Sequence, residues 1–193
     1  MIQINTPEDL RLLGLSMQDK CEDPGAWCKI EEAHVIYAAI QAQKIKTVYE
    51  SGTCNGWSAS WAALAMGKEG IVFTWDIFSK PQIYIGTNLE DRIDNMISPF
   101  HEGVKAPINV RPDHPIGVFI DGNHNTDACQ ADLDAVENKL RVNDLVFIHD
   151  TRRAKYDGIQ KIFEGMIKQG MYEGINFTGT QNGIAIVRKC HKR

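Results

Sequence analysis

Residues 47–66, TVYESGTCNGWSASWAALAM, decide which fold the sequence predicts. A short apolar run stops on Glu50, two glycines follow at Gly52 and Gly56, and small residues with helical character continue from Ser58. Gly52 allows a sharp backbone turn, and Gly56 allows close approach to a ligand because glycine has no Cβ atom. We therefore expect a strand, a glycine loop that is a candidate cofactor site, and a helix.

Short apolar runs and helical segments alternate through the rest of the chain, which predicts an α/β fold with a doubly wound, mostly parallel sheet. Helices are expected at residues 6–17, 30–43, 58–66, 88–97, 126–140 and 159–169. Strands are expected at residues 47–51, 71–77, 117–121 and 145–150, with a weak strand near 107–110. Two last strands, 174–179 and 183–188, are joined through Gln181 and Asn182 and predict an antiparallel hairpin at the C-terminus.

Length and composition fit one domain over residues 1–193 with a sizeable core, since 43% of the residues are hydrophobic. The net charge of −4 argues against a nucleic-acid or membrane surface as partner. The five cysteines form no C-x-x-C pair, which predicts reduced thiols. The first residues lack the basic and apolar regions of a signal peptide, and no apolar run approaches the ~18 residues of a membrane span. A cytoplasmic protein is expected.

Two other apolar runs end on a carboxylate with a histidine nearby: VFIDGNH at 118–124 and LVFIHDT at 145–151. Taken singly, Asp121 and Asp150 each suit a turn or a helix cap. The two aspartates are one strand–helix–strand unit apart, so both are expected at the carboxyl edge of adjacent parallel strands. In open α/β sheets, ligands bind at this edge.

The glycine loop matches neither common phosphate-binding pattern. It reads G-x-x-x-G instead of the dinucleotide pattern G-x-G-x-x-G, and it lacks the lysine of a P-loop. Glu50 would repel a phosphate, while it suits a cationic or hydroxyl-bearing ligand. Asp76 ends the next strand, where an acid can accept both hydroxyls of a ribose. Alone, Asp76 equally suits a turn, but together with the loop it favours a ligand that contains ribose.

TVYESGTCNGWSASWAALAM, VFTWDI, GVFIDGNHNTDACQADLDAV and NDLVFIHDT together resemble the class I S-adenosylmethionine-dependent methyltransferases. They are most similar to methyltransferase family 24, the branch related to macrocin O-methyltransferase and cephalosporin hydroxylase. The resemblance covers residues 46–151, with a weaker match at QNGIAIV. It implies a Rossmann-like, seven-stranded sheet of order 3-2-1-4-5-7-6 with one antiparallel strand. It also implies that residues 1–45 form a helical lid or the contact of a homodimer.

The resemblance implies a set of residues that bind S-adenosylmethionine. Those beside its methionine part are Glu50, Gly52, Thr53, Gly56 and Ser58, with Glu50 suited to the ammonium group; Asp76 matches the ribose acid, and Asp121 also lies beside the cofactor. The segment between Asp76 and the strand at 117–121 leaves little room for the helix that usually precedes this strand. Adenine contacts are therefore expected from Ile77 or Asp113.

The resemblance further implies O-methylation of a small-molecule hydroxyl, such as that of a sugar or phenol. Asp121 and Asp150 match the acids that hold a divalent cation in metal-dependent members, and His124 is a third candidate ligand. Carboxylate oxygens suit Mg²⁺. His149 stands where several members have a second acid, and His149 or His124 is the candidate base for the acceptor proton. The expected catalytic residues are His149, Asp121 and Asp150.

Two other functions stay open. The Gly-Asn-His of DGNHN also occurs in dinuclear metallophosphatases, but the Asp-x-His and Gly-Asp-x-x-Asp elements that such phosphohydrolases need are missing from the first 120 residues. The second is a non-catalytic domain that binds S-adenosylmethionine or a nucleotide for sensing or assembly. That function predicts ligand binding without turnover and without metal dependence.

Overall fold

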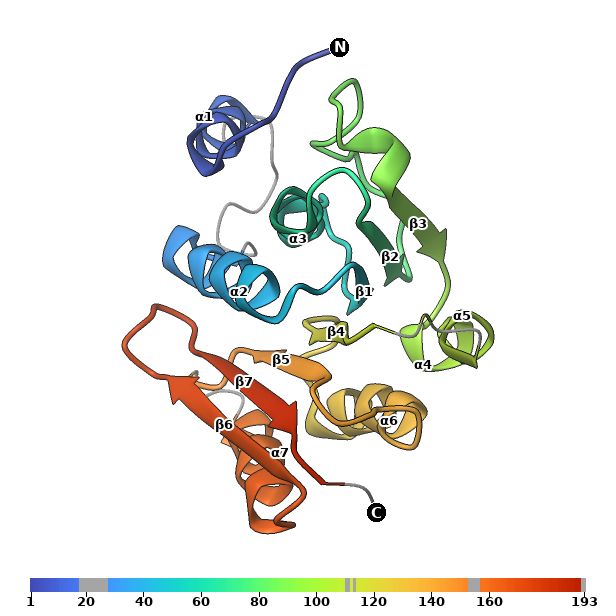
Figure 1. Ribbon diagram of the computed structural model, residues 1–193, viewed down its shortest axis with the longest axis vertical. Coiled ribbons are helices and arrows are strands. Elements are labelled where there is room, and N and C mark those ends of the chain that lie inside the picture. Colours follow the sequence, from blue (N-terminus) through green and yellow to red (C-terminus); the bar gives the residue numbers. More distant parts are fainter. Residues whose placement is uncertain (18–27, 110–111, 113, 153–156, 192–193) are drawn as a thin grey trace.

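The computed structural model describes residues 1–17, 28–109, 112, 114–152 and 157–191 (Figure 1). The strands within these residues are β1 (Thr47–Ser51), β2 (Ile71–Asp76), β3 (Ile93–Ile97), β4 (Ile116–Ile120), β5 (Leu145–His149), β6 (Tyr172–Phe177) and β7 (Ile184–Lys189). They form one seven-stranded sheet of order β3-β2-β1-β4-β5-β7-β6. β7 runs antiparallel to both of its neighbours, and the other pairs are parallel. The expected fold class, strand order and closing hairpin are confirmed.

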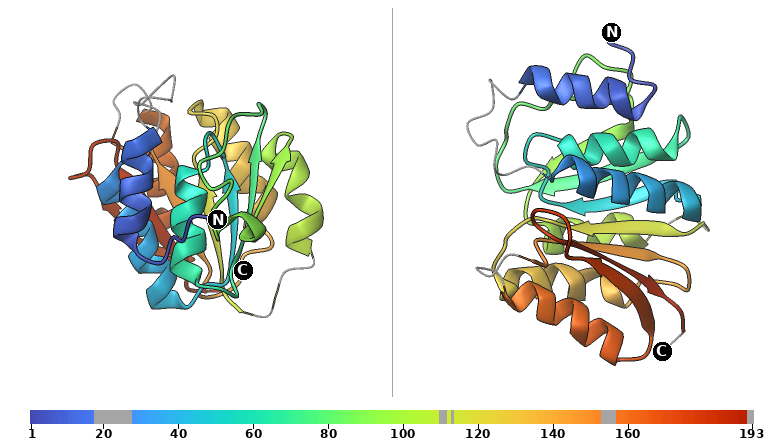
Figure 2. Two further views of the ribbon diagram at one scale, coloured as in Figure 1. Left: turned by 90° about the horizontal axis from the view of Figure 1, so that it is seen from above. Right: turned by 90° about the vertical axis from the view of Figure 1, so that its left-hand side faces the viewer.

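Helices cover both faces of this sheet (Figures 1 and 2). One face carries α1 (Pro7–Met17), α2 (Ile30–Gln43) and α3 (Trp57–Met66), and the other carries α4 (Phe100–Gly103), α5 (Lys105–Asn109), α6 (Thr126–Glu137) and α7 (Asp157–Lys168). Each face has its own hydrophobic core. Every residue of β1, β4 and β5 is buried, as expected for parallel strands covered on both sides.

The segment between β2 and β4 differs from the sequence expectation. The predicted helix at 88–97 is a single 3-10 turn, Glu90–Arg92, followed by β3. Apolar residues at this spacing suit either element, and pairing with the free edge of β2, which aligns Val72 with Ile93, stabilises the strand. The predicted strand near 107–110 is wrong as well, because residues 105–109 form α5. Since β3 ends at Ile97, the two short helices α4 and α5 fit before β4, and the expected lack of room for a helix is also wrong.

The chain order reverses between β1 and β4, which are hydrogen-bonded neighbours at the centre of the sheet. From β1 the chain builds outward through β2 and β3, and from β4 it builds the other way through β5. Open α/β sheets bind ligands beyond the carboxyl ends of the strands at such a reversal. Among the helices that the structure describes, none has the length and apolar character needed to cross a bilayer.

Candidate active site

A pocket of about 860 Å³ lies at the carboxyl ends of β1, β2 and β4. Its wall is formed by the glycine loop, the first turn of α3, and the segments that follow β2, β3 and β4. Of the predicted cofactor residues, the pocket is lined by Gly52, Thr53, Ser58, Asp76, Ile77 and Asp121. Pockets of this size enclose ligands as large as common drugs and cofactors.

The two glycines of the loop have different structural roles. Gly52 has φ +93°, and a Cβ atom there would collide with the backbone carbonyl of Asp121, so only glycine allows β1 and β4 to approach this closely. Gly56 has φ +78° at the start of α3, where a Cβ atom would lie 2.5 Å from the ring of Tyr84. Gly56 is not among the residues that line the pocket; the absence of a Cβ atom allows close packing against Tyr84, and its expected contact with the cofactor stays a prediction.

Asp76 holds the rim of the loop at the end of β2. Its carboxylate accepts hydrogen bonds from the backbone N–H groups of Cys54 (2.8 Å) and Phe78 (3.1 Å). Ile77 follows on the same wall of the pocket with 59% of its surface exposed. Asp113, the other predicted adenine contact, lies outside the described residues. Residues 98–101, after β3, line the pocket too, and they were not predicted from the sequence because β3 was expected to be part of a helix.

Glu50 lies beneath the pocket instead of on its wall. The side chain is buried, with 1% of the residue exposed, and it forms a 2.5 Å hydrogen bond with the hydroxyl of Thr74. Burial raises the pKa of Glu50 to about 8, although the hydrogen bonds from Ser58 and Thr74 oppose the rise. A neutral, buried acid does not present a charge to an ammonium group. Glu50 is not among the residues that line the pocket, and its expected contact with the ammonium group of the cofactor stays a prediction.

Asp121, His124 and Asp150 come together as predicted for a cation site. Their ligand atoms all lie within 4.8 Å of one another, and Nδ1 of His124 contacts the carboxylate of Asp150. Asp121 and His124 line the pocket, while Asp150 is buried behind them. Asp150 has φ 59°, a left-handed conformation that non-glycine residues adopt mainly at functional sites or turns. Two carboxylates and an imidazole at this spacing fit a divalent cation.

His149 is held between two carboxylates. Its Nδ1 lies 2.7 Å from Asp121 Oδ1, and its Nε2 lies 2.8 Å from Glu32 Oε2. Burial lowers the pKa of His149, but the charge of Asp121 and the hydrogen bonds with Asp121, Cys28 and Glu32 outweigh this effect and raise the pKa well above its usual value. An imidazolium that donates both protons cannot accept a third, and His149 does not line the pocket. The expected role of His149 as general base stays a prediction, and the position of the ring outside the pocket wall does not favour it.

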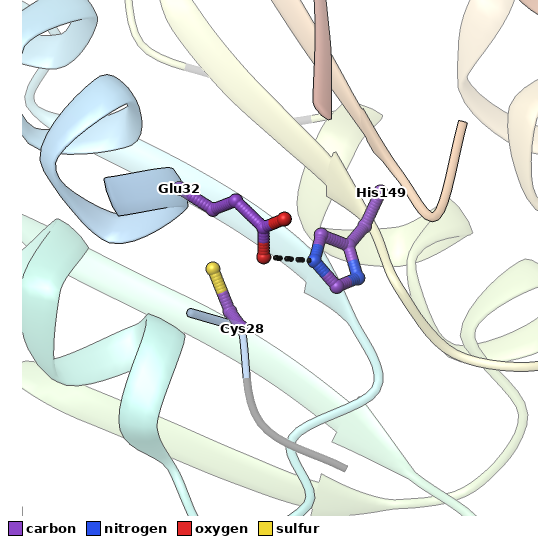
Figure 3. Close-up of side chains that lie close together, drawn as sticks. All are labelled: Cys28, Glu32 and His149. Atoms are coloured by element: carbon purple, nitrogen blue, oxygen red, sulfur yellow. Dashed lines mark hydrogen bonds and ion pairs between the residues drawn. The ribbon is translucent and has the colours of Figure 1, made fainter. Parts of the chain in front are cut away.

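Glu32 was missed in the sequence because it lies in α2, far along the chain from the carboxylate motifs. Figure 3 shows its side chain pointing at His149, with the thiol of Cys28 beside it. Glu32 also accepts hydrogen bonds from the backbone N–H groups of Asn182 (2.7 Å) and Gly183 (3.1 Å) in the turn between β6 and β7. Acidic residues are common in the first turn of a helix, so the sequence carried no signal for these distant contacts.

A second group of polar side chains lines the pocket near α6. Asp132 is buried, accepts a hydrogen bond from the hydroxyl of Ser51 (2.6 Å), and lies 3.2 Å from Nδ1 of His101. No role was predicted for these three residues from the sequence. They join the end of β1 to α4 and α6.

The sheet order and the pocket at its reversal are those of a class I methyltransferase. A family model described as a methyltransferase domain matches residues 49–151, more than half of the chain. The chain belongs to this family, methyltransferase family 24. No protein of curated function matches it significantly in sequence.

Solved structures of methyltransferases share the fold. The O-methyltransferase TomG from Streptomyces achromogenes, in complex with SAM, has 13% identity and a TM-score of 0.72, with 94% of this chain and 89% of that chain covered. The O-methyltransferase from Bacillus cereus, in complex with SAH, has 17% identity and a TM-score of 0.69, with coverage of 93% and 90%. The methyltransferase PaMTH1 from Podospora anserina, bound to SAH, has 12% identity and a TM-score of 0.70, with coverage of 98% and 91%.

Proposed function

We propose that the protein transfers a methyl group from S-adenosylmethionine to a hydroxyl oxygen of a small molecule, such as a sugar or a phenol, with the help of a divalent cation. The observation that carries this proposal is one pocket, in a chain of methyltransferase family 24, that combines the glycine loop, Asp76 and the carboxylate of Asp121. The O-methyltransferases of similar fold support oxygen as the acceptor atom.

The cofactor would lie along the glycine loop. Gly52, Thr53 and Ser58 line this part of the pocket, and the N-terminus of α3 favours the carboxylate of the methionine part. Asp76 would accept the ribose hydroxyls, because each carboxylate oxygen can accept more than the one N–H it already binds. The adenine would lie between Ile77 and Phe100, which line the pocket after β2 and β3.

Methyl transfer is an in-line displacement: the bond from the acceptor oxygen to the methyl carbon forms as the bond from that carbon to sulfur breaks. Alignment of the two reactants and exclusion of water therefore provide much of the catalysis. The acceptor must also lose its hydroxyl proton. Asp121, His124 and Asp150 would hold a divalent cation, which acts as a Lewis acid and makes that proton easier to remove. If no cation is bound, His124 is instead the side chain on the pocket wall that can take the proton, with the buried Asp150 beside it.

Substitution of the two aspartates separates the cation from the cofactor. Asp150→Asn and Asp121→Asn should each weaken Mn²⁺ binding and lower turnover by about 10–100-fold. Asp150→Asn should leave S-adenosylmethionine affinity largely unchanged, because Asp150 is not one of the expected cofactor residues. Electron paramagnetic resonance measures free Mn²⁺, calorimetry measures cofactor affinity, and release of S-adenosylhomocysteine with a panel of catechols, phenols and sugars measures turnover.

Each negative result of these measurements would contradict a different part of the proposal. Folded protein that does not bind S-adenosylmethionine would refute the methyltransferase proposal. Cofactor binding without turnover on any acceptor would support the non-catalytic binding domain. Turnover that persists in the presence of chelators would show that no cation is needed. His124, with Asp150 beside it, would then be the base.

A further inference from the structure

A continuous chain of hydrogen-bonded charges connects α2 to the pocket. It runs from Glu32 in α2 through His149 at the end of β5 to Asp121 after β4, with contacts of 2.8 and 2.7 Å. The side chains of Glu32 and His149 are 0% and 3% exposed, and that of Asp121 is 12% exposed. Of the three, Asp121 is the one that lines the pocket. Water is thus kept from both contacts of the central histidine.

Hydrogen bonds from backbone N–H groups fix the orientation of the Glu32 carboxylate independently of His149. Oε1 accepts the N–H groups of Asn182 and Gly183, and Oε2 accepts the N–H of Lys29 at 2.8 Å. A carboxylate has about four lone-pair sites, so the N–H donors and His149 together fill Glu32. The group drawn in Figure 3 is therefore held by hydrogen bonds, although the ligand atoms of Cys28, Glu32 and His149 also lie close enough together to hold a metal ion.

The ring of His149 is fixed in turn. With Nε2 donating to Glu32, the opposite nitrogen points at Oδ1 of Asp121 and holds that oxygen. Oδ2 of Asp121 is then left for the pocket. Partners of this kind, placed behind a ligand or reactive group, orient it and raise metal affinity or activity.

We propose that Glu32 is a positioning residue for the pocket carboxylate Asp121 and acts on it through His149. Glu32 lies outside residues 49–151, which the family model matches, so the N-terminal segment would supply part of the active site as well as cover it. The proposal rests on the proposed function, in which Asp121 binds the cation. The proposal predicts that a change in the packing of α2 against the sheet also changes the position of the Asp121 carboxylate.

The test compares three single substitutions in the full chain. Glu32→Ala removes the acceptor for Nε2 of His149. Glu32→Gln keeps the side-chain shape and the oxygen that binds Asn182 and Gly183, and its amide can still contact the ring. Glu31→Ala is the matched control, because Glu31 is an exposed acid in the same turn of α2.

Histidine ring protons report the geometry without cofactor or cation. In protein with ¹⁵N-labelled histidine, both ring protons of His149, assigned by their loss in His149→Asn, should be far downfield and slow to exchange. Glu32→Ala should remove the protected proton on Nε2, which loses its acceptor, and should speed exchange of the Nδ1 proton that faces Asp121, because the ring is no longer held. Glu32→Gln should keep the Nδ1 proton slow to exchange. Glu31→Ala should leave both protons in place.

Turnover and Mn²⁺ affinity should follow the same order. We expect Glu32→Ala to lower both by about 10–100-fold relative to wild type. Glu32→Gln should lower both by less, with a logarithmic loss of at most about half that of Glu32→Ala. S-adenosylmethionine affinity should stay within about twofold in Glu31→Ala, and in Glu32→Ala it should fall less than Mn²⁺ affinity, because Glu32 reaches the pocket only through His149 and Asp121.

Two results would overturn the proposal: a folded Glu32→Ala variant that keeps the Nδ1 proton and wild-type turnover, or a loss of turnover matched by an equal loss of cofactor affinity. A stoichiometric transition metal in the purified protein that Glu32→Ala releases would also overturn it, in favour of a metal centre at Cys28, Glu32 and His149. If the wild-type protein neither binds Mn²⁺ nor transfers methyl groups, the proposed function fails, while the ring protons still decide whether Glu32 orders His149 and Asp121.

Discussion

At the scale of single residues, the partners of two buried glutamates set opposite charge states. Burial raises the pKa of Glu50 to about 8, since its hydroxyl partners stabilise the charge too weakly to offset the lost water. Burial acts in the same direction on Glu32, but its hydrogen bond with His149 and the charge of His149, with the N–H groups of Lys29 and Asn182, lower the pKa to about 2. Near neutral pH, Glu50 is mostly protonated and Glu32 is ionised.

Glu50 makes stability depend on pH. The folded protein holds the Glu50 proton more tightly than the unfolded chain does, since the pKa rises from 4.5 to about 8 on folding. The free energy of unfolding should therefore be highest below the unfolded pKa and decrease as pH rises through this interval, by on the order of 1 kcal/mol per pH unit at most. Glu50→Gln stays neutral, so it should gain stability relative to wild type as pH increases.

Urea unfolding of both proteins between about pH 5 and about pH 9 measures this difference. Parallel stability curves for wild type and Glu50→Gln would show that Glu50 is not protonated in the fold. Glu69→Gln, on an exposed acid between α3 and β2, is the control and should follow wild type.

Asp76 carries a prediction about the cofactor. Asp76→Ala should weaken S-adenosylmethionine binding by about 1.5–3 kcal/mol, the range for hydrogen bonds to a charged acceptor. Asp76→Asn should lose less, since its side-chain oxygen can still accept the N–H of Cys54. Calorimetry gives the affinities, with Asp91→Ala, an exposed acid away from the pocket, as control. An unchanged dissociation constant in folded Asp76→Ala would remove the ribose assignment.

At the scale of elements, α3 is the helix around which the N-terminal face is packed. All ten of its residues are buried, which explains why the sequence gives it small side chains. Trp57, its first residue, is held by a 2.8 Å hydrogen bond from its indole N–H to the carbonyl of Cys28 and also lines the pocket. α1 packs on this ring through Gly14, where a Cβ atom would lie 2.7 Å from Cη2 of Trp57 and closer still to Cζ3.

Two glycine-to-alanine changes in helices should therefore have opposite effects. Alanine favours a helix over glycine by up to about 1 kcal/mol. At Gly165 in α7 no atom lies within 4 Å of an added Cβ, so Gly165→Ala should stabilise the protein by about that amount. Gly14→Ala gains the same helix propensity, but the added Cβ atom would collide with the Trp57 ring, which its hydrogen bond to Cys28 holds in place. Such overpacking costs about 1–3 kcal/mol, so Gly14→Ala should destabilise the protein. Urea unfolding compares the two, and equal stabilisation by both would show that α1 does not pack tightly on Trp57.

At the scale of the whole molecule, the N-terminal helix α2 is joined to the C-terminal hairpin of β6 and β7. Glu32 links α2 to the turn before β7, and Ala33, Ile36 and Ile40 of α2 belong to the same hydrophobic core as α3. This arrangement supports our proposal that residues 1–45 are part of one domain with the rest of the chain.

Deletion of residues 1–44 tests that proposal. The deletion would expose the outer face of the apolar helix α3, so we expect a fragment that lacks a cooperative thermal transition and does not bind S-adenosylmethionine. Circular dichroism and calorimetry measure both properties. Co-expression of residues 1–44 as a separate chain should restore them at least in part. A fragment that unfolds cooperatively on its own would show that the N-terminal helices are a separate attachment.

The sequence by itself determined the strands that are buried on both faces and the neighbouring positions of Asp121 and Asp150. Long apolar runs identify such strands locally, and the rules of parallel sheets then place their carboxyl ends together. β3 could not be identified from the sequence, because its short apolar pattern suits a helix or a strand until β2 offers an edge for pairing. The tertiary structure also decided which of the predicted residues reach the pocket.

The charges of Glu50, His149 and Glu32 were decided only by the tertiary structure. A pKa depends on burial and on the nearest charges and donors, and here these come from segments far apart in the chain. Glu32 is 117 residues from His149 and 150 residues from Asn182. A sequence pattern spans a few turns of helix or one strand, so it predicts where a carboxylate stands but not what surrounds it. For that reason the position of the acid cluster was predictable, and the protonation of its neighbours was not.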